Sequence, residues 1–320
     1  MPPYQDVRVL VLGASGFIGR WVARRLHQAG ADLYVAARDV RKLPHEECFS
    51  RQAMDIDLLD PAALPGIVRE AAPEIVFNLA GYGINPAERD SARAAAINAE
   101  FLPQLVTAMK QVPTTRWQGQ RIVHTGSALE YGTCSGDLAE TTCTRPTTLY
   151  GRTKLAGTLA LQQSAEQHGI AGITARLFTV YGPGERAGRL LPSLLEIART
   201  GGSLELTAGT QHRDFTYVED VVEGLLRLGT TRTSPGEVVN LATGQLTSVR
   251  QFTEITARVL GIPAGHLHFG ALPVREEEMA HKPVSTSKLR KLLSWVPTTT
   301  IQQGIERTLQ REKQTGVEIT

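Results

Sequence analysis

The sequence predicts an α/β protein with a doubly wound parallel sheet. Apolar, strand-like runs alternate with segments of helical spacing through the first half of the chain, and a glycine-rich turn directly follows the first run. The regular alternation lapses after residue 184, which indicates a smaller α/β lobe towards the C-terminus. Ligands of doubly wound sheets bind beyond the carboxyl ends of the strands, so the functional residues are expected there.

The individual elements follow from local patterns. Residues 7–14 and 32–38 are apolar, β-branched runs, and the helix-periodic segment between them ends at Gly30, so the three form a βαβ unit. Further strands are expected at 74–81, 120–127 and 172–182, with helices at 93–111 and 150–168. Beyond residue 184 we expect a helix, a short strand and a loop that leads into another helix, which together cover the strand ends.

The turn after the first strand has the pattern of a phosphate-binding loop. Its glycines have the spacing G-x-x-G-x-x-G and lie between a strand and a helix, where they permit a tight turn and let backbone N–H groups approach a pyrophosphate. The residues expected to bind a dinucleotide in this stretch are Gly13, Ser15, Gly16, Phe17, Ile18 and Gly19. We therefore expect a Rossmann domain over 1–178 and a mainly substrate-binding lobe over 179–320, with the chain returning to the first domain around 214–243.

The choice of dinucleotide depends on the end of the second strand. An acidic residue there binds the ribose 2′-hydroxyl of NAD, whereas an arginine accepts the 2′-phosphate of NADP. The strand ends in Ala37 and Arg38, and Arg41 and Lys42 follow within a turn, so NADP(H) is the expected cofactor. NAD(H) stays open as the alternative because Asp39 is the next residue and the basic side chains could belong to a solvated loop.

Composition excludes several classes of protein. The 320 residues are 42% hydrophobic and 21% charged, and the net charge of +2 is spread over scattered basic residues, which argues against a nucleic-acid-binding protein. No apolar stretch has the length of a membrane span and no secretory leader pattern is visible, so a cytoplasmic location without membrane contact is expected. The three cysteines, Cys48, Cys134 and Cys143, form no CxxC pair and are expected to be reduced.

Seven short motifs, in order along nearly the whole chain, carry a family resemblance. They are GASGFIG (13–19), NLAG (78–81), TGSALEYG (125–132), YGRTK (150–154), RLFTVYGPG (176–184), RDFTYVED (213–220) and LLSWVPTTTIQQGI (292–305). As a set they resemble the extended short-chain dehydrogenase/reductase family, in its branch of nucleotide-sugar epimerases, dehydratases and reductases. The resemblance implies an enzyme that acts on a nucleotide-diphosphate sugar with a nicotinamide cofactor.

Tyr150 and Lys154 are the expected centre of the chemistry. Residues four apart share a helix face, and a nearby ammonium group stabilises a phenolate and lowers the pKa of tyrosine. The resemblance assigns Lys154 a second contact, with the nicotinamide ribose, and assigns Ser127 a hydrogen bond to the reacting sugar oxygen. The predicted catalytic residues are therefore Ser127, Tyr150 and Lys154.

The resemblance also implies further binding residues. Asp55 and Ile56 match an acidic–apolar pair at the adenine, although Asp55 could instead cap the next turn. The segment Leu79, Ala80 and Gly81 matches one that runs beneath the ribose on the nicotinamide side, and Asn98 matches a structural asparagine.

The predicted substrate contacts, apart from Ser127, are Thr179, Arg189, Arg213 and Arg275. The arginines would clamp the diphosphate, since a guanidinium fork suits that group. Arg213 could instead pair with Asp214 or Asp220, and Arg275 with the acidic run that follows it. No metal site is expected, because His266 and His268 lack a third ligand in register.

Two reactions remain open on these residues. The first is NADPH-dependent reduction of a 4-keto-6-deoxy nucleotide sugar, with the proton from Tyr150, and the alternative is NAD-dependent 4-epimerisation. Dehydration is disfavoured because Ala128 and Leu129 stand where dehydratases carry an acid pair, and Glu130 is expected to point away in an extended chain. A catalytically inert, cofactor-sensing regulator is disfavoured because Tyr150 and Lys154 are both present.

A homodimer is expected from the family resemblance. The helices at 93–111 and 150–168 would form the interface, and their apolar positions extend beyond one face. These additional apolar positions include Leu155, Leu159 and Leu161. Either helix could instead be buried within one subunit.

Overall fold

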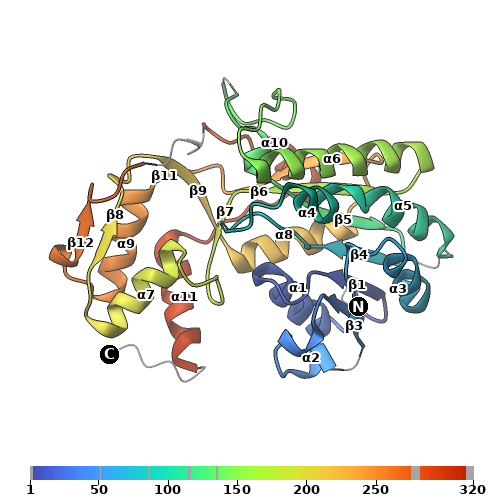
Figure 1. The fold of residues 1–320 in the computed structure, drawn as a ribbon, viewed down its shortest axis with the longest axis horizontal. Coiled ribbons are helices and arrows are strands. Elements are labelled where there is room, and N and C mark those ends of the chain that lie inside the picture. Colours follow the sequence, from blue (N-terminus) through green and yellow to red (C-terminus); the bar gives the residue numbers. More distant parts are fainter. Residues whose placement is uncertain are drawn as a thin grey trace.

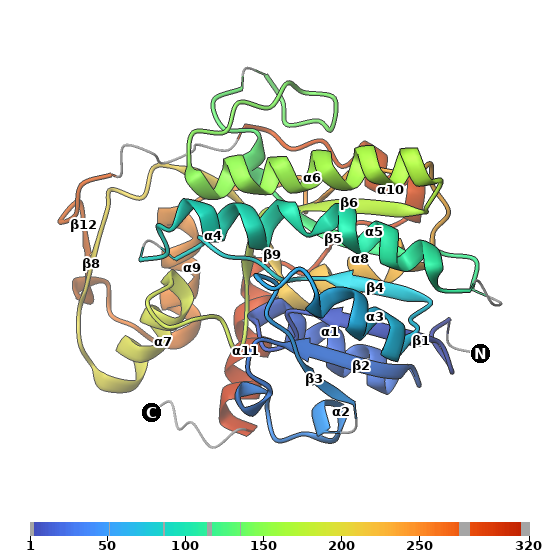
Figure 2. The same cartoon turned by 45° about the vertical axis from the view of Figure 1, so that its right-hand side comes forward.

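The computed structural model describes residues 3–50, 52–85, 87–113, 117–134, 136–274 and 282–314. Its main feature is a seven-stranded sheet with the order β3-β2-β1-β4-β5-β6-β10, in which every neighbouring pair is parallel (Figures 1 and 2). The strands are β1 (Arg8–Leu12), β2 (Asp32–Ala37), β3 (Ala53–Asp55), β4 (Ile75–Asn78), β5 (Ile122–Ser127), β6 (Gly172–Leu177) and β10 (Glu237–Leu241). The predicted doubly wound α/β fold is confirmed.

Helices cover both faces of this sheet. On one face lie α1 (Phe17–Gln28) and α8 (Val218–Thr230), and on the other lie α3 (Ala63–Ala71), α5 (Leu102–Gln111) and α6 (Leu149–His168). Successive residues of β1 supply the two cores in turn: Val9 and Val11 face α1 and α8, whereas Leu10 and Leu12 face the other layer. Burial on both faces explains why the strands read as continuous apolar runs.

Shorter helices fill the connections. These are α2 (Glu47–Ser50), α4 (Ser91–Ala95) and α10 (Ser287–Leu293), with 3₁₀ turns at Val40–Lys42, Ala128–Glu130 and Ala264–His266. Between α4 and α5 the chain forms one π-helical turn, Ala96–Glu100. The single helix expected at 93–111 is therefore three consecutive helical segments.

The second lobe holds two small sheets and three helices. Within the described residues, its sheets have the orders β11-β9-β7 and β12-β8, and its helices are α7 (Leu190–Thr200), α9 (Val249–Leu260) and α11 (Ile301–Gln314) (Figure 1). The strands are β7 (Thr179–Tyr181), β8 (Leu204–Leu206), β9 (His212–Tyr217), β11 (Leu246–Ser248) and β12 (Leu267–Phe269).

Two expectations for this region are wrong. The strand expected over 172–182 is interrupted at Phe178, so β6 stays in the large sheet while β7 pairs with β9 in the second lobe. The segment expected as a loop before α8 contains β9, which pairs with both β7 and β11. Apolar patterning identifies a buried extended chain but does not reveal which sheet it joins.

The chain leaves the large sheet and comes back to it. After β9 it enters α8, which contacts α1, and then β10, which pairs with β6 at the edge of the sheet. Residues 218 to 241 thus lie with the large sheet, although they follow the first part of the second lobe in sequence.

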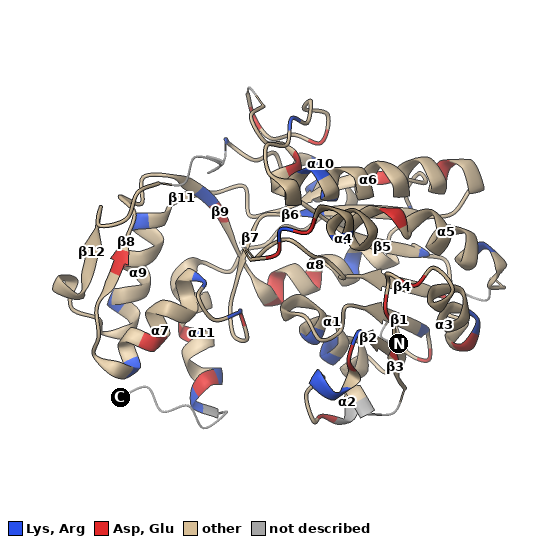
Figure 3. Cartoon of the chain, viewed as in Figure 1, with Lys and Arg blue, Asp and Glu red and all other residues tan. Residues whose placement is uncertain are grey.

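Charged residues of both signs occur in both lobes. Figure 3 shows basic and acidic residues on elements of both lobes. Among the helices that the structure describes, none combines the length and the apolar character needed to cross a membrane.

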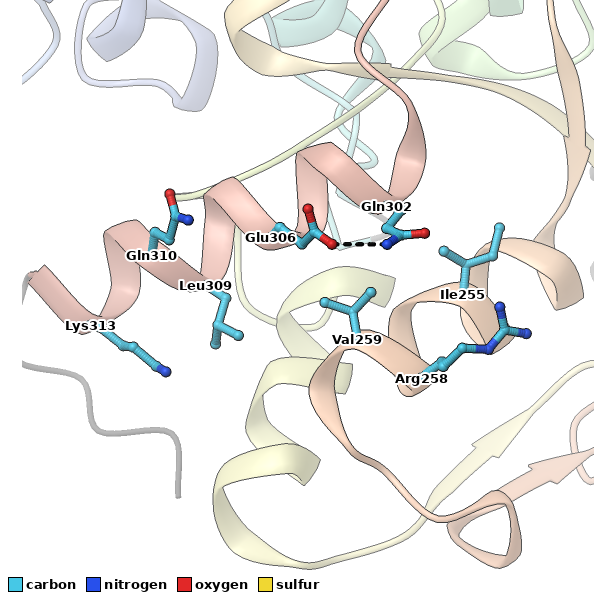
Figure 4. Close-up of a pocket in the computed structure, with 8 residues that line it drawn as sticks. All are labelled: Ile255, Arg258, Val259, Gln302, Glu306, Leu309, Gln310 and Lys313. Atoms are coloured by element: carbon cyan, nitrogen blue, oxygen red, sulfur yellow. Dashed lines mark hydrogen bonds between the residues drawn. The ribbon is translucent and has the colours of Figure 1, made fainter.

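A groove of about 460 Å³ lies between α9 and α11 (Figure 4). Ile255, Val259 and Leu309 give it apolar walls, and Glu306 accepts a hydrogen bond from Gln302 at 2.9 Å along one side. It contains none of the residues that the sequence singles out for binding or catalysis.

Candidate active site

The glycine-rich loop joins β1 to α1 at the carboxyl edge of the large sheet. Gly13 has a φ of +80°, and a side chain there would lie 2.7 Å from the backbone nitrogen of Ala80. A side chain at Gly19 would overlap the carbonyl oxygen of Gly13. The loop therefore lies directly against the Leu79–Gly81 segment, and only glycine permits that approach.

The first turn of α1 fits the phosphates of a dinucleotide. Its N-cap residue is Gly16, which has no side chain to cap the helix, and the first turn contains no acidic residue. The N–H groups of a first helical turn have no intrahelical acceptor, and they carry the positive end of the helix dipole. This combination suits an anion, so Phe17, Ile18 and Gly19 are the residues that would hold a pyrophosphate through their backbone.

The basic residues after β2 differ in their surroundings. Arg38 is exposed, and its guanidinium forms no hydrogen bond or ion pair with another residue that the structure describes. Arg41 donates two hydrogen bonds to the Asp39 carboxylate, and Lys42 lies 3.9 Å from the same group. Asp39 is thus already neutralised by its neighbours, and Arg38 is the side chain available to a ligand at this strand end.

Asp55 and Ile56 adjoin the same strand end. Asp55 accepts a hydrogen bond from the Val40 N–H at 3.0 Å, so its carboxylate binds the earlier turn after β2 rather than the turn that follows it, which the alternative interpretation proposed. Ile56 is buried and donates its N–H to the Ala37 carbonyl at 2.9 Å. The adenine contact predicted for this pair remains a prediction.

Ser127 ends β5 and begins a single 3₁₀ turn. Its Oγ accepts a hydrogen bond from the Leu129 N–H at 3.2 Å, and its own N–H donates to the Glu130 carboxylate at 2.7 Å. One lone pair of the hydroxyl is therefore occupied, while its proton is free to be donated. That is the arrangement required to hold a substrate oxygen.

Tyr150 and Lys154 lie in the first turns of α6. Thr148 caps the start of the helix, and its hydroxyl accepts the Gly151 N–H at 2.9 Å. A side chain at Gly151 would overlap the Leu129 carbonyl oxygen, so this glycine lets the helix lie directly against the 3₁₀ turn that follows Ser127. The three predicted catalytic residues are thereby brought to the same edge of the sheet.

Burial controls the titration of both side chains. It raises the pKa of Tyr150 well above its usual range, and the negative charges of Glu130 and Glu88 add to this, whereas Arg189 lowers it. Burial lowers the pKa of Lys154 to about 8, while the charge of Glu130 acts in the opposite direction. The lowered pKa of Tyr150 that the pairing with Lys154 predicts is therefore not seen, because desolvation outweighs the attraction to Arg189.

Asn98 fixes α6 from the π-helical turn. Its side-chain amide donates to the Thr153 hydroxyl and to the Tyr82 carbonyl, both at 2.8 Å, and its carbonyl oxygen accepts the Tyr82 N–H at 3.0 Å. A side chain at Gly157 would overlap the Asn98 carbonyl, so the two helices touch along their backbones. The structural role expected for Asn98 agrees with these contacts.

Glu130 is a functional candidate that the sequence interpretation misplaced. We expected it in an extended chain, pointing away, but it completes the 3₁₀ turn and is fully buried. Its carboxylate forms an ion pair with Arg176 at 2.8 Å and accepts the Thr158 hydroxyl at 3.1 Å. The S-x-x-E spacing from Ser127 to Glu130 is a capping-box pattern and could have revealed this turn.

The predicted substrate contacts lie on the second lobe. Thr179 begins β7, and Arg213 lies on β9, where its guanidinium donates to the His212 carbonyl at 3.0 Å. Arg189 precedes α7 and acts electrostatically on Tyr150, which places it near the catalytic edge. Arg275 lies outside the described residues.

Arg189 has a buried acidic partner that the sequence did not suggest. Its Nε donates to Glu185 at 3.2 Å, and the Glu185 side chain is only 8% exposed. Burial raises the pKa of Glu185 to about 7. Next to this pair, Arg186 lies 3.9 Å from Glu88, which in turn accepts the Gly83 N–H at 2.9 Å and so links the two lobes.

Asp220, one of the two acidic partners considered for Arg213, receives hydrogen bonds from other residues. The Asp220 carboxylate accepts hydrogen bonds from Thr298 and Thr299. Within the described residues no group of three or more His, Cys, Asp or Glu side chains could hold a metal ion. All three cysteines are unpaired thiols, as predicted.

Comparison with known proteins identifies the family of the chain. Residues 9–242 match the family model of the NAD dependent epimerase/dehydratase family. The chain therefore belongs to that family, and it is an enzyme of the extended short-chain dehydrogenase/reductase type.

Individual relatives act on nucleotide sugars. The chain is 30% identical over 315 residues to the dTDP-6-deoxy-L-talose 4-dehydrogenase (NAD(P)(+)) of Kitasatospora kifunensis, and the match covers 95% of each chain. Its fold is similar to that of MoeE5 in complex with UDP-glucuronic acid and NAD, with a TM-score of 0.82, 26% identity and coverage of 96% and 99%. It is also similar to the UDP-glucuronic acid 4-epimerase of Bacillus cereus, with a TM-score of 0.81, 25% identity and the same coverage.

Proposed function

We propose that this enzyme reduces the 4-keto group of a 4-keto-6-deoxy sugar attached to a nucleoside diphosphate, with NADPH as the preferred cofactor. The observation that carries the proposal is the burial of Tyr150, which raises its pKa and keeps the phenol protonated at neutral pH. A reductase requires a proton donor at that position, whereas an epimerase must first remove a proton from the sugar. The similarity to a 6-deoxy-talose 4-dehydrogenase, which carries out chemistry at the same carbon of a 6-deoxy sugar, supports this choice.

Each catalytic residue has one role in this reaction. The bound nicotinamide supplies the hydride that is added to C4. Tyr150 donates its phenolic proton to the oxygen on C4, and the Ser127 hydroxyl donates a hydrogen bond to the same oxygen. Lys154 provides the positive charge that stabilises the phenolate left behind, and it would also hold the nicotinamide ribose.

The preference for NADPH rests on Arg38. Its guanidinium has no partner among the described residues, whereas the neighbouring Asp39 is occupied by Arg41 and Lys42. An unoccupied arginine at the end of β2 suits a 2′-phosphate, and an occupied aspartate is less available to the hydroxyl of an NAD ribose. The NAD(P) in the name of the talose relative supports use of either cofactor.

Arginines are proposed to hold the diphosphate. Arg189 and Arg213 lie on the second lobe, and Arg275 is the third residue in this proposal. The three relatives described above are named for dTDP and UDP sugars, so we propose that the nucleotide carries a pyrimidine base.

A nucleotide-sugar 4-epimerase is the second candidate. It is favoured by the structural similarity to MoeE5 with NAD and to a 4-epimerase of UDP-glucuronic acid. The same three residues would serve it, but the phenolate of Tyr150 would act first as a base. The cofactor would then be reduced and reoxidised within one turnover.

A homodimer through α5 and α6 is also proposed. Leu159 is 53% exposed on α6 and fits such an interface. Leu161 does not, because it is fully buried against the sheet. Light scattering of the wild type and Leu159→Glu would test this surface.

The proposed reaction is tested by mixing the enzyme with a dTDP-linked 4-keto-6-deoxyhexose and either NADPH or NADH. The proposal predicts loss of reduced-cofactor absorbance in proportion to sugar consumed, faster with NADPH. Interconversion of UDP- or dTDP-sugars at C4 without net change in the cofactor would instead establish the epimerase.

A further inference from the structure

Three charged side chains are buried together behind the catalytic edge. Glu130 is 0% exposed, Lys154 2% and Arg176 4%, and they come from the 3₁₀ turn, α6 and β6. Charges removed from water are costly unless each has a partner. Glu130 is the one acidic member of this cluster, so it supplies the negative charge that compensates for burying Lys154 and Arg176.

Four hydrogen-bonding contacts converge on the Glu130 carboxylate. Oε1 accepts the Ser127 N–H at 2.7 Å, Oε2 accepts the Arg176 Nε–H at 2.8 Å, and the Thr158 hydroxyl lies 3.1 Å from both oxygens. The carboxylate thus joins the end of β5, strand β6 and helix α6. Rotation of Ser127 about its backbone would break the shortest of these contacts.

The same carboxylate acts on the proton-transfer pair. Among the described residues, Glu130 is the acidic group whose charge favours the protonated form of Lys154. Burial and Glu130 both raise the pKa of Tyr150, to which Glu88 also contributes, while Arg189 opposes them. His124, fully buried on β5, interacts with Lys154 and is held neutral by burial.

Arg176, the ion-pair partner of Glu130, is itself packed against an anchored ring. Its guanidinium lies 4.6 Å from the ring centroid of Tyr131, whose hydroxyl donates to Asn240 at 2.8 Å. Asn240 in turn donates to the Leu138 carbonyl at 2.9 Å. Arg176 therefore has two partners, the Glu130 carboxylate and the Tyr131 ring, and both restrict where its guanidinium can lie.

We propose that Glu130 is a positioning residue for proton transfer, which anchors Ser127 through its backbone N–H and serves as the buried counter-charge of Lys154. It touches neither substrate nor cofactor in this role. The inference rests on the proposed use of Ser127, Tyr150 and Lys154 in proton transfer. It does not depend on whether that transfer serves reduction or epimerisation.

Three variants separate the two parts of this role. Glu130→Gln keeps an oxygen for the Ser127 N–H but removes the charge. Because it leaves Arg176 unpaired and could fail to fold, Glu130→Gln/Arg176→Met removes both charges at similar volume. Glu130→Leu/Arg176→Met further removes the acceptor for the Ser127 N–H.

Glu74→Gln is the matched control, since Glu74 is a buried carboxylate that accepts the Arg8 N–H at the opposite edge of the sheet.

The experiment measures kcat, KM and the pH profile of kcat for whichever of the two reactions the wild type catalyses. Both Gln variants are expected to lose roughly tenfold to a hundredfold in kcat with little change in KM. Loss of the Glu130 charge lowers the pKa of both Lys154 and Tyr150. Reduction needs the protonated phenol of Tyr150, so the alkaline limb of its pH profile moves to lower pH. Epimerisation needs the phenolate, so the acid limb of its pH profile moves to lower pH.

The Leu double variant is expected to lose roughly another tenfold in kcat relative to the Gln double variant. Glu74→Gln should match the wild type. The inference is overturned if folded Gln variants keep the wild-type kcat and pH profile, or if Glu74→Gln shows the same losses. Failure of the wild type to reduce a 4-keto sugar would refute the proposed reductase alone, since the variants are then compared in epimerisation.

Discussion

The Asn98 amide donates a hydrogen bond to the Thr153 hydroxyl at 2.8 Å and so ties the π-helical turn to the helix that carries Tyr150 and Lys154. Asn98 is fully buried and also binds both backbone groups of Tyr82. Asn98→Ala would leave these groups unsatisfied and should lower the free energy of unfolding by about 2 to 3 kcal/mol. Urea unfolding measures this loss, and exposed Gln104→Ala should show almost none. Equal stability of the two variants would contradict the structural role of Asn98.

Tyr150→Phe tests the proton donor. The change removes one hydroxyl and no packing, so kcat should fall roughly a hundredfold to ten-thousandfold while the melting temperature and cofactor affinity stay near wild type. Tyr34→Phe, on β2 away from the carboxyl edge, is the matched control. Steady-state kinetics and thermal unfolding of the two variants check the prediction. Retention of activity by Tyr150→Phe would show that another group supplies the proton.

Arg38→Ala tests the choice of cofactor. A charge-assisted hydrogen bond contributes about 1.5 to 3 kcal/mol, so the affinity for NADP+ should fall roughly tenfold to a hundredfold. The affinity for NAD+ should not change, because NAD+ lacks the 2′-phosphate. Calorimetric titration gives both values, with Arg25→Ala on the exposed side of α1 as control. An equal loss for the two cofactors, or none, would remove the basis for an NADP preference.

Glu185 predicts a specific pH dependence of stability. Burial raises its pKa from 4.5 to about 7, so the folded protein binds this proton more tightly than the unfolded chain does. Protonation of Glu185 therefore adds to the free energy of unfolding, and this stabilisation is fully present below pH 4.5 and is lost as the pH rises to about 7. The difference in the free energy of unfolding is about 3 kcal/mol. Glu185→Gln should abolish this part of the loss in urea unfolding at the two pH values. An unchanged pH dependence would mean that Glu185 titrates normally.

The sequence suffices for those parts of the fold and site that depend on local pattern. The glycine spacing of the β1–α1 turn predicts the phosphate loop, because a positive φ at Gly13 and close approach at Gly19 demand glycine. The four-residue separation of Tyr150 and Lys154 predicts their common helix face. Both depend only on residues near each other in the chain.

The remaining features depend on contacts between distant segments. Phe178 separates two strands of different sheets, and no periodicity marks that division. Glu130 is buried because Arg176, 46 residues later, meets it from β6. The raised pKa of Tyr150 likewise follows from burial by several elements. The spacing of Tyr150 and Lys154 alone predicted a lowered pKa, which is the wrong direction of shift.

The most direct test of the central claim uses NADPH deuterated at the transferable position of the nicotinamide, together with a nucleoside-diphosphate 4-keto-6-deoxysugar. NMR of the product locates the label. We predict one deuterium at C4 of the sugar and one equivalent of NADP+ for each sugar reduced. A sugar inverted at C4 without deuterium, and with no net oxidation of the cofactor, would contradict the proposed reductase.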